Sequence, residues 1–118
     1  MNQPTPPDYT SYVEARYPET CKEYKRLQQE EYAVFCRKQH DYGSGNISLG
    51  SSLTTEEDIY ASLCSIIFRQ FDKVQRLLNL IVKRPGTSPA NEPVEDAFGD
   101  LACYSKIAMI VKAGKWGK

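Results

Sequence analysis

Three acidic side chains recur at intervals of four residues near the end of the chain: Glu92, Asp96 and Asp100. On a helix this spacing places them on one face, where neighbouring carboxylates repel one another. A divalent cation would relieve the repulsion, and Mg²⁺ takes oxygen ligands, usually one or two carboxylates with water and phosphate oxygens. Acids that face each other from two helices of a bundle often build such a site. Glu31, which falls on the apolar stripe of an earlier helix, could supply the facing carboxylate, or it pairs with a nearby Lys or Arg.

A dense group of polar residues and glycines lies earlier, in the stretch KQHDYGSGNI that begins at Lys38. It contains the only histidine, His40, together with Asp41. Gly43 and Gly45 can adopt positive φ, which ends a helix and leaves backbone N–H groups exposed. Such N–H groups beside cationic side chains suit a phosphate or the edge of a nucleobase. The stretch is therefore either an ordinary helix stop or a loop that contacts a ligand.

The elements that would position these residues are read from apolar periodicity and from the residues that begin and end helices. The first predicted helix runs from about Pro18 to Gln39, since proline suits a first turn and Glu19 favours the positive end of the helix dipole. Its apolar stripe consists of Tyr24, Leu27, Val34 and Phe35. Residues 1–17, rich in Pro and Tyr, are predicted to form an irregular N-terminal arm.

A second long helix is predicted from the capping box of Thr54 and Glu57 to about residue 83, before a Pro/Gly-rich connection. Its broad apolar face makes it the clearest element of the chain. Three basic residues recur along one flank of this helix: Arg69, Lys73 and Arg76. This basic row is either a solvated face or the lining of a polar cavity.

A last helix is predicted from about Asn91, a good cap residue, to about Ala113, where Gly114 stops it. Its second half, IAMIV, is apolar on nearly every side, as expected for a buried helix end. No segment shows the alternation of a strand. The chain is therefore predicted to be all-α, with a compact bundle of three to four main helices forming a single domain over residues 18–118.

The apolar surface of the second helix also predicts self-association. This helix has more apolar surface than two short neighbours can cover. A homo-oligomer is therefore expected, and such an assembly can place sites between subunits.

Length and charge narrow the classes of function. The 118 residues suffice for one domain, and 15 Lys plus Arg balance 15 Asp plus Glu. A duplex nucleic-acid binder would normally be clearly basic, so duplex binding is not expected. No apolar run approaches a membrane span and no signal peptide is read, so we expect a cytoplasmic location and no membrane partner. The four cysteines are far apart and give no zinc pattern.

Three segments, in order, carry a resemblance to a known family. KQHDYGSGNI contains the pattern lysine–x–x–aspartate–tyrosine–glycine, and DKVQRLLNL contains lysine–x–x–arginine–leucine at Lys73 and Arg76. NEPVEDAFGDLACYSKIAMI spaces three acids four residues apart before leucine–alanine–x–tyrosine, which ends at Tyr104. Together, over about residues 30–112, these motifs resemble the nucleotide modification associated domain family, type one, whose members are small and mostly phage-encoded. One departure is Cys103, where the family pattern has asparagine.

The resemblance implies a phage-type protein of the host-cell cytoplasm that binds a nucleotide or a nucleotide-derived ligand. The family is similar in layout to all-α nucleoside triphosphate pyrophosphatases, which implies a Mg²⁺-dependent pyrophosphohydrolase as one activity. The acid set of those enzymes is incomplete here, so no catalytic residue is assigned. Two alternatives stay open: a non-catalytic anti-defence protein that sequesters a nucleotide signal, and a helical protein-interaction module.

The same residues would form the site whether or not a nucleotide is hydrolysed. The predicted ligand-binding residues are Lys38, His40, Asp41, Tyr42, Gly43, Asn46, Lys73, Arg76 and Tyr104. The predicted Mg²⁺ ligands are Glu31, Glu92, Asp96 and Asp100. The lysines and the arginine would grip phosphate oxygens, while His40 and Tyr42 would face the base. Asp41 is expected to brace the loop, either by capping it or by pairing with Lys73 or Arg76.

Overall fold

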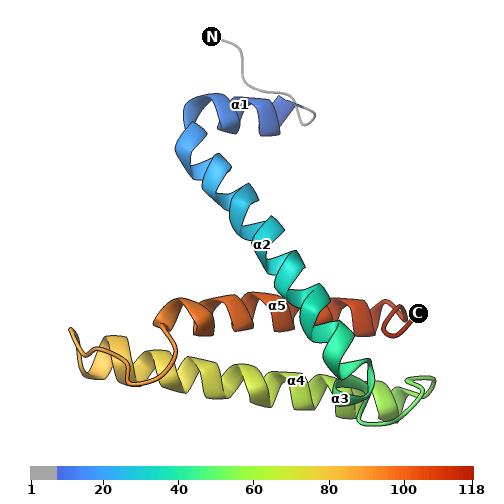
Figure 1. The fold of residues 1–118 in the computed structure, drawn as a ribbon. Coiled ribbons are helices and arrows are strands. Elements are labelled where there is room, and N and C mark those ends of the chain that lie inside the picture. Colours follow the sequence, from blue (N-terminus) through green and yellow to red (C-terminus); the bar gives the residue numbers. More distant parts are fainter. Residues whose placement is uncertain (1–7) are drawn as a thin grey trace. The chain divides into compact units, whose positions relative to one another are not determined.

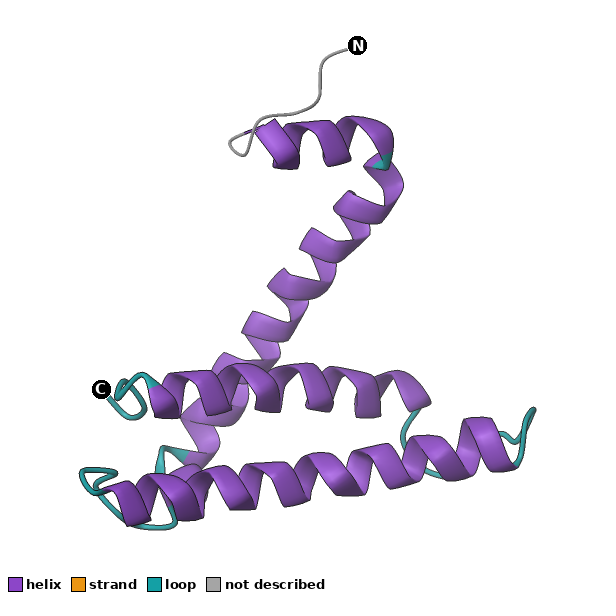
Figure 2. Cartoon of the chain, turned by 180° about the vertical axis from the view of Figure 1, so that it is seen from behind, coloured by secondary structure: helices purple, strands orange, loops and turns teal. Residues whose placement is uncertain are grey.

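The computed structural model describes residues 8–118, and every regular element in that range is helical (Figures 1 and 2). The elements in chain order are α1 (Tyr9–Arg16), α2 (Pro18–Tyr42), α3 (Gly45–Ser48), α4 (Glu56–Leu77), the π-helical segment η2 (Leu78–Lys83) and α5 (Val94–Lys112). The all-α prediction is thereby confirmed. Within the described range, no helix combines the length and the apolar character that crossing a membrane requires.

The described chain divides into two units, one that ends at Cys36 and one that spans Arg37–Lys118. The boundary falls inside α2, so the first part of this helix belongs to one unit and its last residues belong to the other. The prediction of a single helical domain over residues 18–118 stays a prediction.

The N-terminal segment is helical where the sequence predicts an irregular arm. Residues 9–16 form α1, so the prediction is wrong for this segment, and residues 1–7 lie outside the described residues. The prolines that suggest irregular structure all flank α1, so none of them removes a backbone donor from its interior. An ion pair between Glu14 Oε2 and Lys25 Nζ, 2.5 Å apart, joins α1 to α2.

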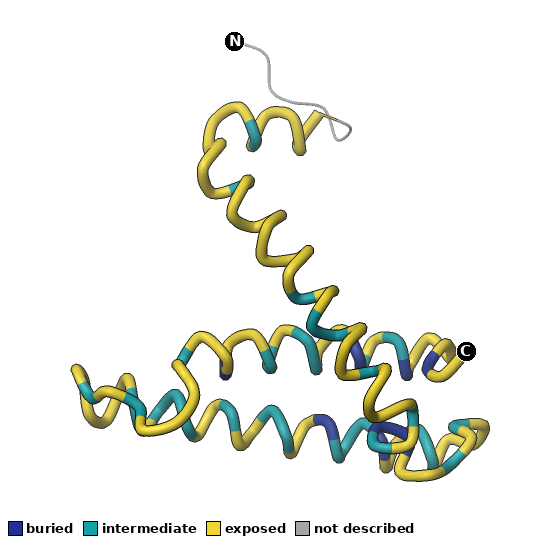
Figure 3. The backbone as a smooth tube through the Cα atoms, in the orientation of Figure 1, coloured by how far each residue is buried: buried dark blue, intermediate teal, exposed yellow. Residues whose placement is uncertain are grey.

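The predicted apolar stripe of α2 does not form a core, although the helix begins at Pro18 as predicted. No residue of α1 or α2 is buried (Figure 3), and Tyr24 of the stripe is mostly exposed. Arg26 forms ion pairs with Glu23 and Glu30, one turn away on either side. The hydrogen bond from Arg26 lowers the pKa of Glu23, so this carboxylate is ionised at neutral pH. Surface ion pairs of this spacing therefore support the helix.

Gly43 ends α2 in the way that a glycine stop predicts. Its φ is +67°, and its N–H donates to the carbonyl oxygen of Gln39 at 2.8 Å. The helix extends to Tyr42, three residues beyond the predicted end. Gly45 opens α3 without a positive φ, so only the first of the two glycines uses the left-handed conformation. The stretch that begins at Lys38 is thus a helix stop followed at once by a short helix.

Three backbone carbonyls in and beside α3 are held by side chains from distant parts of the unit. Ser62 Oγ donates to the Ile47 oxygen at 2.6 Å, where both residues are buried. Arg69 donates to the Asn46 oxygen at 2.9 Å. The indole N–H of Trp116 donates to the oxygen of Ser44 at 3.0 Å. The glycine-containing stretch is therefore fastened to α4 and to the C-terminal segment.

The helices α4 and α5 lie side by side and run in opposite directions (Figures 1 and 2). Six apolar side chains are buried among residues 37–118: Ile47, Ile66, Ala97, Ile107, Val111 and Trp116. Gln70 joins the two helices by donating to the Leu101 oxygen at 3.2 Å and to Ser105 Oγ at 2.8 Å. The second half of α5 is not buried on every side, because Met109 is exposed.

Thr55, and not the predicted Thr54, caps the N-terminus of α4. Thr55 Oγ1 accepts a hydrogen bond from the Asp58 N–H at 3.1 Å, and its backbone is extended, as is usual for this position. Thr54 Oγ1 instead lies 3.0 Å from Ser52 Oγ. The predicted capping box of Thr54 and Glu57 is therefore wrong by one residue.

Replacing Thr55 with alanine is expected to lower the free energy of unfolding by about 1 kcal/mol, because the Asp58 N–H loses its acceptor at the helix start. Thr54→Ala is the matched control, and its effect should stay below about 0.5 kcal/mol, as for most exposed positions. Urea denaturation followed by far-UV circular dichroism measures both. Equal losses in the two variants would contradict the assignment of the cap.

Candidate functional site

Two lysines from different helices share a single carboxylate. Asp100 of α5 lies 2.9 Å from Lys73 Nζ of α4 and 3.6 Å from Lys38 Nζ of α2. The hydrogen bond to Asp100 raises the pKa of Lys73 above its ordinary value of 10.5, so the ammonium is protonated throughout the physiological range. The sequence prediction that these three residues belong to one site is consistent with this geometry. We call Lys38, Lys73 and Asp100 the lysine–aspartate cluster.

Tyr104 lies one turn beyond Asp100 on α5 and extends the lysine–aspartate cluster along the helix. The guanidinium carbon of Arg69 lies 5.9 Å from the centre of its ring, within the range of a cation–π contact. The same guanidinium group holds the carbonyl of Asn46. The predicted site residues do not include Arg69. Its position in the basic row, one turn before Lys73, indicates that it belongs with them.

Arg76 contacts the segment that leads into α5. Its guanidinium group donates to the backbone oxygens of Glu92 and Pro93, the latter at 3.4 Å. Arg76, Asn91 and Glu92 line an open depression at this point. The basic row of α4 therefore contacts α3, α5 and the segment before α5, so its interpretation as a solvated face is wrong.

Glu92 does not belong to the acidic ladder predicted on the last helix. The helix α5 begins at Val94, and the residue before it, Pro93, is extended with ψ of 154°. A proline disfavours helical backbone in the residue that precedes it, so Glu92 is kept outside the helix and Asn91 is not its cap. Only Asp96 and Asp100 of the ladder share a helical face.

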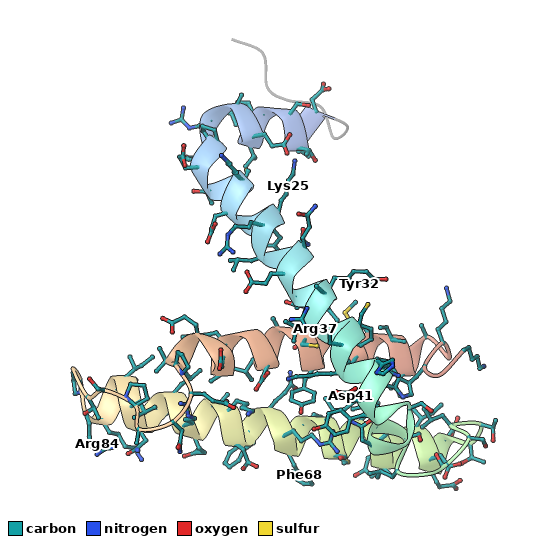
Figure 4. The ribbon with its side chains drawn as sticks, in the orientation of Figure 1. Lys25, Tyr32, Arg37, Asp41, Phe68 and Arg84 are labelled. Atoms are coloured by element: carbon teal, nitrogen blue, oxygen red, sulfur yellow. The ribbon has the colours of Figure 1, made fainter. Side chains whose placement is uncertain are left out.

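The last turn of α2 carries three predicted site residues that are exposed: His40, Asp41 and Tyr42. His40 Nδ1 lies 3.0 Å from Asp41 Oδ1, and both side chains are largely in solvent. Figure 4 labels Asp41 at this end of the helix. The prediction that Asp41 pairs with Lys73 or Arg76 is wrong, since Lys73 pairs with Asp100 and Arg76 holds backbone carbonyls.

Asn46, another predicted site residue, combines a satisfied backbone with an unsatisfied side chain. Its carbonyl oxygen accepts from Arg69, whereas its buried Oδ1 has no hydrogen-bond donor within the described structure. A buried acceptor without a donor costs about 1–3 kcal/mol. Rotating the amide would place an NH₂ group in the same position and leave donors unsatisfied instead.

No three of the predicted Mg²⁺ ligands come together among the described residues. Among residues 8–118, no group of three or more His, Cys, Asp or Glu side chains is close enough to hold a metal ion. Asp100 pairs with two lysines, Glu92 lies outside α5, and Asp96 is exposed. Glu31 lies half-buried in the unit that ends at Cys36. The use of Mg²⁺ by this protein therefore stays a prediction.

No protein-family model, curated protein or solved structure matches this chain. The family resemblance given by the three motifs therefore stays a prediction.

Proposed function

We propose that residues 37–118 bind a nucleotide or a nucleotide-derived ligand whose phosphate groups are held by Lys38 and Lys73. The observation that supports this proposal is the sharing of Asp100 by the two ammonium groups. One carboxylate carries a single negative charge, so one positive charge of the lysine–aspartate cluster is uncompensated. A phosphate group, with more negative charge and more acceptor oxygens, can compete with Asp100 for both lysines.

Aromatic residues near the lysines provide surfaces for a base. Tyr42 lies four residues after Lys38 and therefore on the same face of α2, and it is exposed. His40 lies two residues after Lys38 and so faces another direction, which makes it the weaker candidate. Tyr104 is already covered in part by the guanidinium group of Arg69. In the proposed complex, Tyr42 contacts the base, and Arg69 adds positive charge beside the phosphates.

Binding without turnover is the form of this proposal that the contacts favour. A Mg²⁺-dependent pyrophosphohydrolase needs carboxylates that are free to hold the metal. Asp100, the predicted ligand nearest to the lysines, forms ion pairs with both of them instead. Sequestration of a nucleotide signal, as in an anti-defence protein, requires only the binding step.

The proposal is tested by titrating the full chain with inorganic phosphate, dNTPs, and linear and cyclic nucleotides, each with Mg²⁺ and with EDTA. Selective binding raises the unfolding temperature by mass action, and calorimetry gives the dissociation constant. We expect that a nucleotide binds in the presence of EDTA, without Mg²⁺, and that it is recovered chemically intact. Pyrophosphate release that requires Mg²⁺ would support hydrolysis in place of sequestration, and the absence of any shift across the panel would refute nucleotide binding.

Three variants assign the binding to the lysine–aspartate cluster. Lys73→Gln and Lys38→Gln should each weaken binding about tenfold or more, as loss of a charged hydrogen bond predicts. Lys112→Gln, at an exposed position in the last turn of α5, is the matched control and should bind like the wild type. Asp100→Asn should tighten binding, because it removes the competing carboxylate, whereas a metal ligand at this position would make the same variant inactive.

A further inference from the structure

One face of α4, continued by the first residue of η2, carries an apolar stripe that its own unit leaves mostly exposed. The residues of this stripe follow one another at alternating intervals of four and three. They are Tyr60, Cys64, Ile67, Phe71, Val74 and Leu78. We call these six residues the α4 seam. Four of them are exposed and the other two, Cys64 and Leu78, are half-buried. Alternating intervals of four and three are the spacing with which helices pack along a coiled-coil contact.

The α4 seam lies away from the core that α4 already serves. Ile66 is fully buried, and Phe71 lies about 140° around the helix from it, at 3.6 residues per turn. Phe68 flanks the seam and projects from the side of α4 that faces away from α5 (Figure 4). The helix therefore has two apolar faces, of which its own unit uses one.

The exposed apolar area approaches that of a protein interface. Tyr60, Phe68 and Phe71 are 71%, 69% and 57% exposed. Since an aromatic side chain offers about 150–250 Å², these three leave roughly 300–500 Å² open to solvent. Monomeric proteins rarely expose much more than a few hundred Å² in one patch. Further exposed apolar area comes from Ile67, Val74 and residues 81–82 of η2. With these residues the exposed apolar area approaches that of a standard protein interface, which is about 800 Å² per partner.

The distribution of charge favours a second copy in the antiparallel direction. The seam itself contains no charged residue, so two copies can meet along it without burying an ion. Acids open α4 at Glu56, Glu57 and Asp58, and the bases Lys83 and Arg84 follow at the other end. Antiparallel copies place each acidic end beside a basic end, whereas parallel copies place like charges together.

We propose that two copies of this chain pair through the α4 seam as an antiparallel, two-fold symmetric dimer. In the register centred on residue 71, each Phe71 lies beside its own counterpart near the two-fold axis, and Tyr60 lies opposite residues 81–82 of the second copy. Cys64 then lies opposite Leu78 of the second copy, and Ile67 opposite Val74 of the second copy. The same register brings Glu57 close to Arg84 of the second copy. This pairing requires no ligand and stands independently of nucleotide binding.

The first test is the oligomeric state of the full chain, measured by sedimentation over a range of concentrations. The wild type should be a dimer, and Phe71→Glu should weaken dimerisation about 30-fold or more, as expected for a central aromatic contact. Met109→Glu, at a similarly exposed apolar position on α5, is the control and should leave the dimer intact. A monomeric wild type, or a Phe71→Glu variant that dimerises normally with an unchanged circular dichroism spectrum, would overturn the proposal.

The second test reads the direction of pairing from disulfide formation. Disulfides require Cα atoms within about 7 Å. In the antiparallel dimer the two Cys64 residues are 14 positions apart along the helix, about 21 Å at 1.5 Å per residue. Leu78→Cys should therefore cross-link to Cys64 of the second copy under mild oxidation, and peptide mass spectrometry distinguishes this bond from those of the other native cysteines. A Cys64–Cys64 bond in the wild type would show parallel copies and overturn the antiparallel assignment.

Discussion

Replacing Trp116 with alanine is expected to lower the free energy of unfolding by about 3–5 kcal/mol. The ring is 7% exposed and completes the core from beyond the end of α5. Its removal leaves a cavity and also leaves the Ser44 carbonyl without its donor. Because small domains are stabilised by only about 5–15 kcal/mol, the loss is a large part of the total. Urea denaturation followed by circular dichroism measures it without depending on fluorescence from the only tryptophan.

Trp116→Phe separates the two contributions, since phenylalanine keeps most of the apolar ring and loses the N–H donor. We expect this variant to retain more than half of the stability that the alanine variant loses. Gly117, the next residue, has φ of +75°, and a Cβ there would lie 3.2 Å from Ser44 Cβ. Gly117→Ala should therefore also destabilise the contact. If the free energy of unfolding of Trp116→Ala lies within about 1 kcal/mol of the wild-type value, the C-terminal segment does not pack on α3.

The helices are predictable from the sequence because the signals that begin and end them are local. Pro18 opens α2 and Gly43 closes it, and both follow from the conformations that proline and glycine favour. The cap of α4 is harder, because Thr54 and Thr55 are each followed by an acid three residues later. Only the backbone conformation shows which hydroxyl reaches an N–H group. The start of α5 is predictable from Pro93, because a proline disfavours helical backbone in the residue before it.

The sequence predicts which residues belong to the candidate site better than it predicts which side chains those residues contact. Periodicity places Lys73 and Asp100 on faces of their own helices, and both belong to the observed lysine–aspartate cluster. It does not tell which group of another helix each one meets, so Asp41 is assigned the wrong partner and the two ion pairs of Asp100 are not foreseen. The contact of Trp116 with Ser44, 72 residues away, has no local signal at all.

Ile66→Ala is expected to cost about 2–5 kcal/mol of unfolding free energy. The side chain is 0% exposed and belongs to the helix that packs on both α3 and α5. Ile66→Val, which removes one methylene group, should cost about 0.5–1.5 kcal/mol and provides a graded control. Both are measured by urea denaturation at low protein concentration. An alanine variant no less stable than the valine variant would contradict the burial of this position.

The neighbouring residue Ile67 distinguishes the two apolar faces of α4. It is 58% exposed, so in dilute protein Ile67→Ala should change stability by less than about 0.5 kcal/mol. If copies pair through the α4 seam, the same substitution weakens the dimer, and its cost grows as the protein concentration rises. The cost of Ile66→Ala should not show that additional growth, because Ile66 contributes to the fold of each copy. The stability costs of the two substitutions should therefore depend differently on protein concentration. Stability measurements alone would then show which face of α4 folds the chain and which face joins two chains.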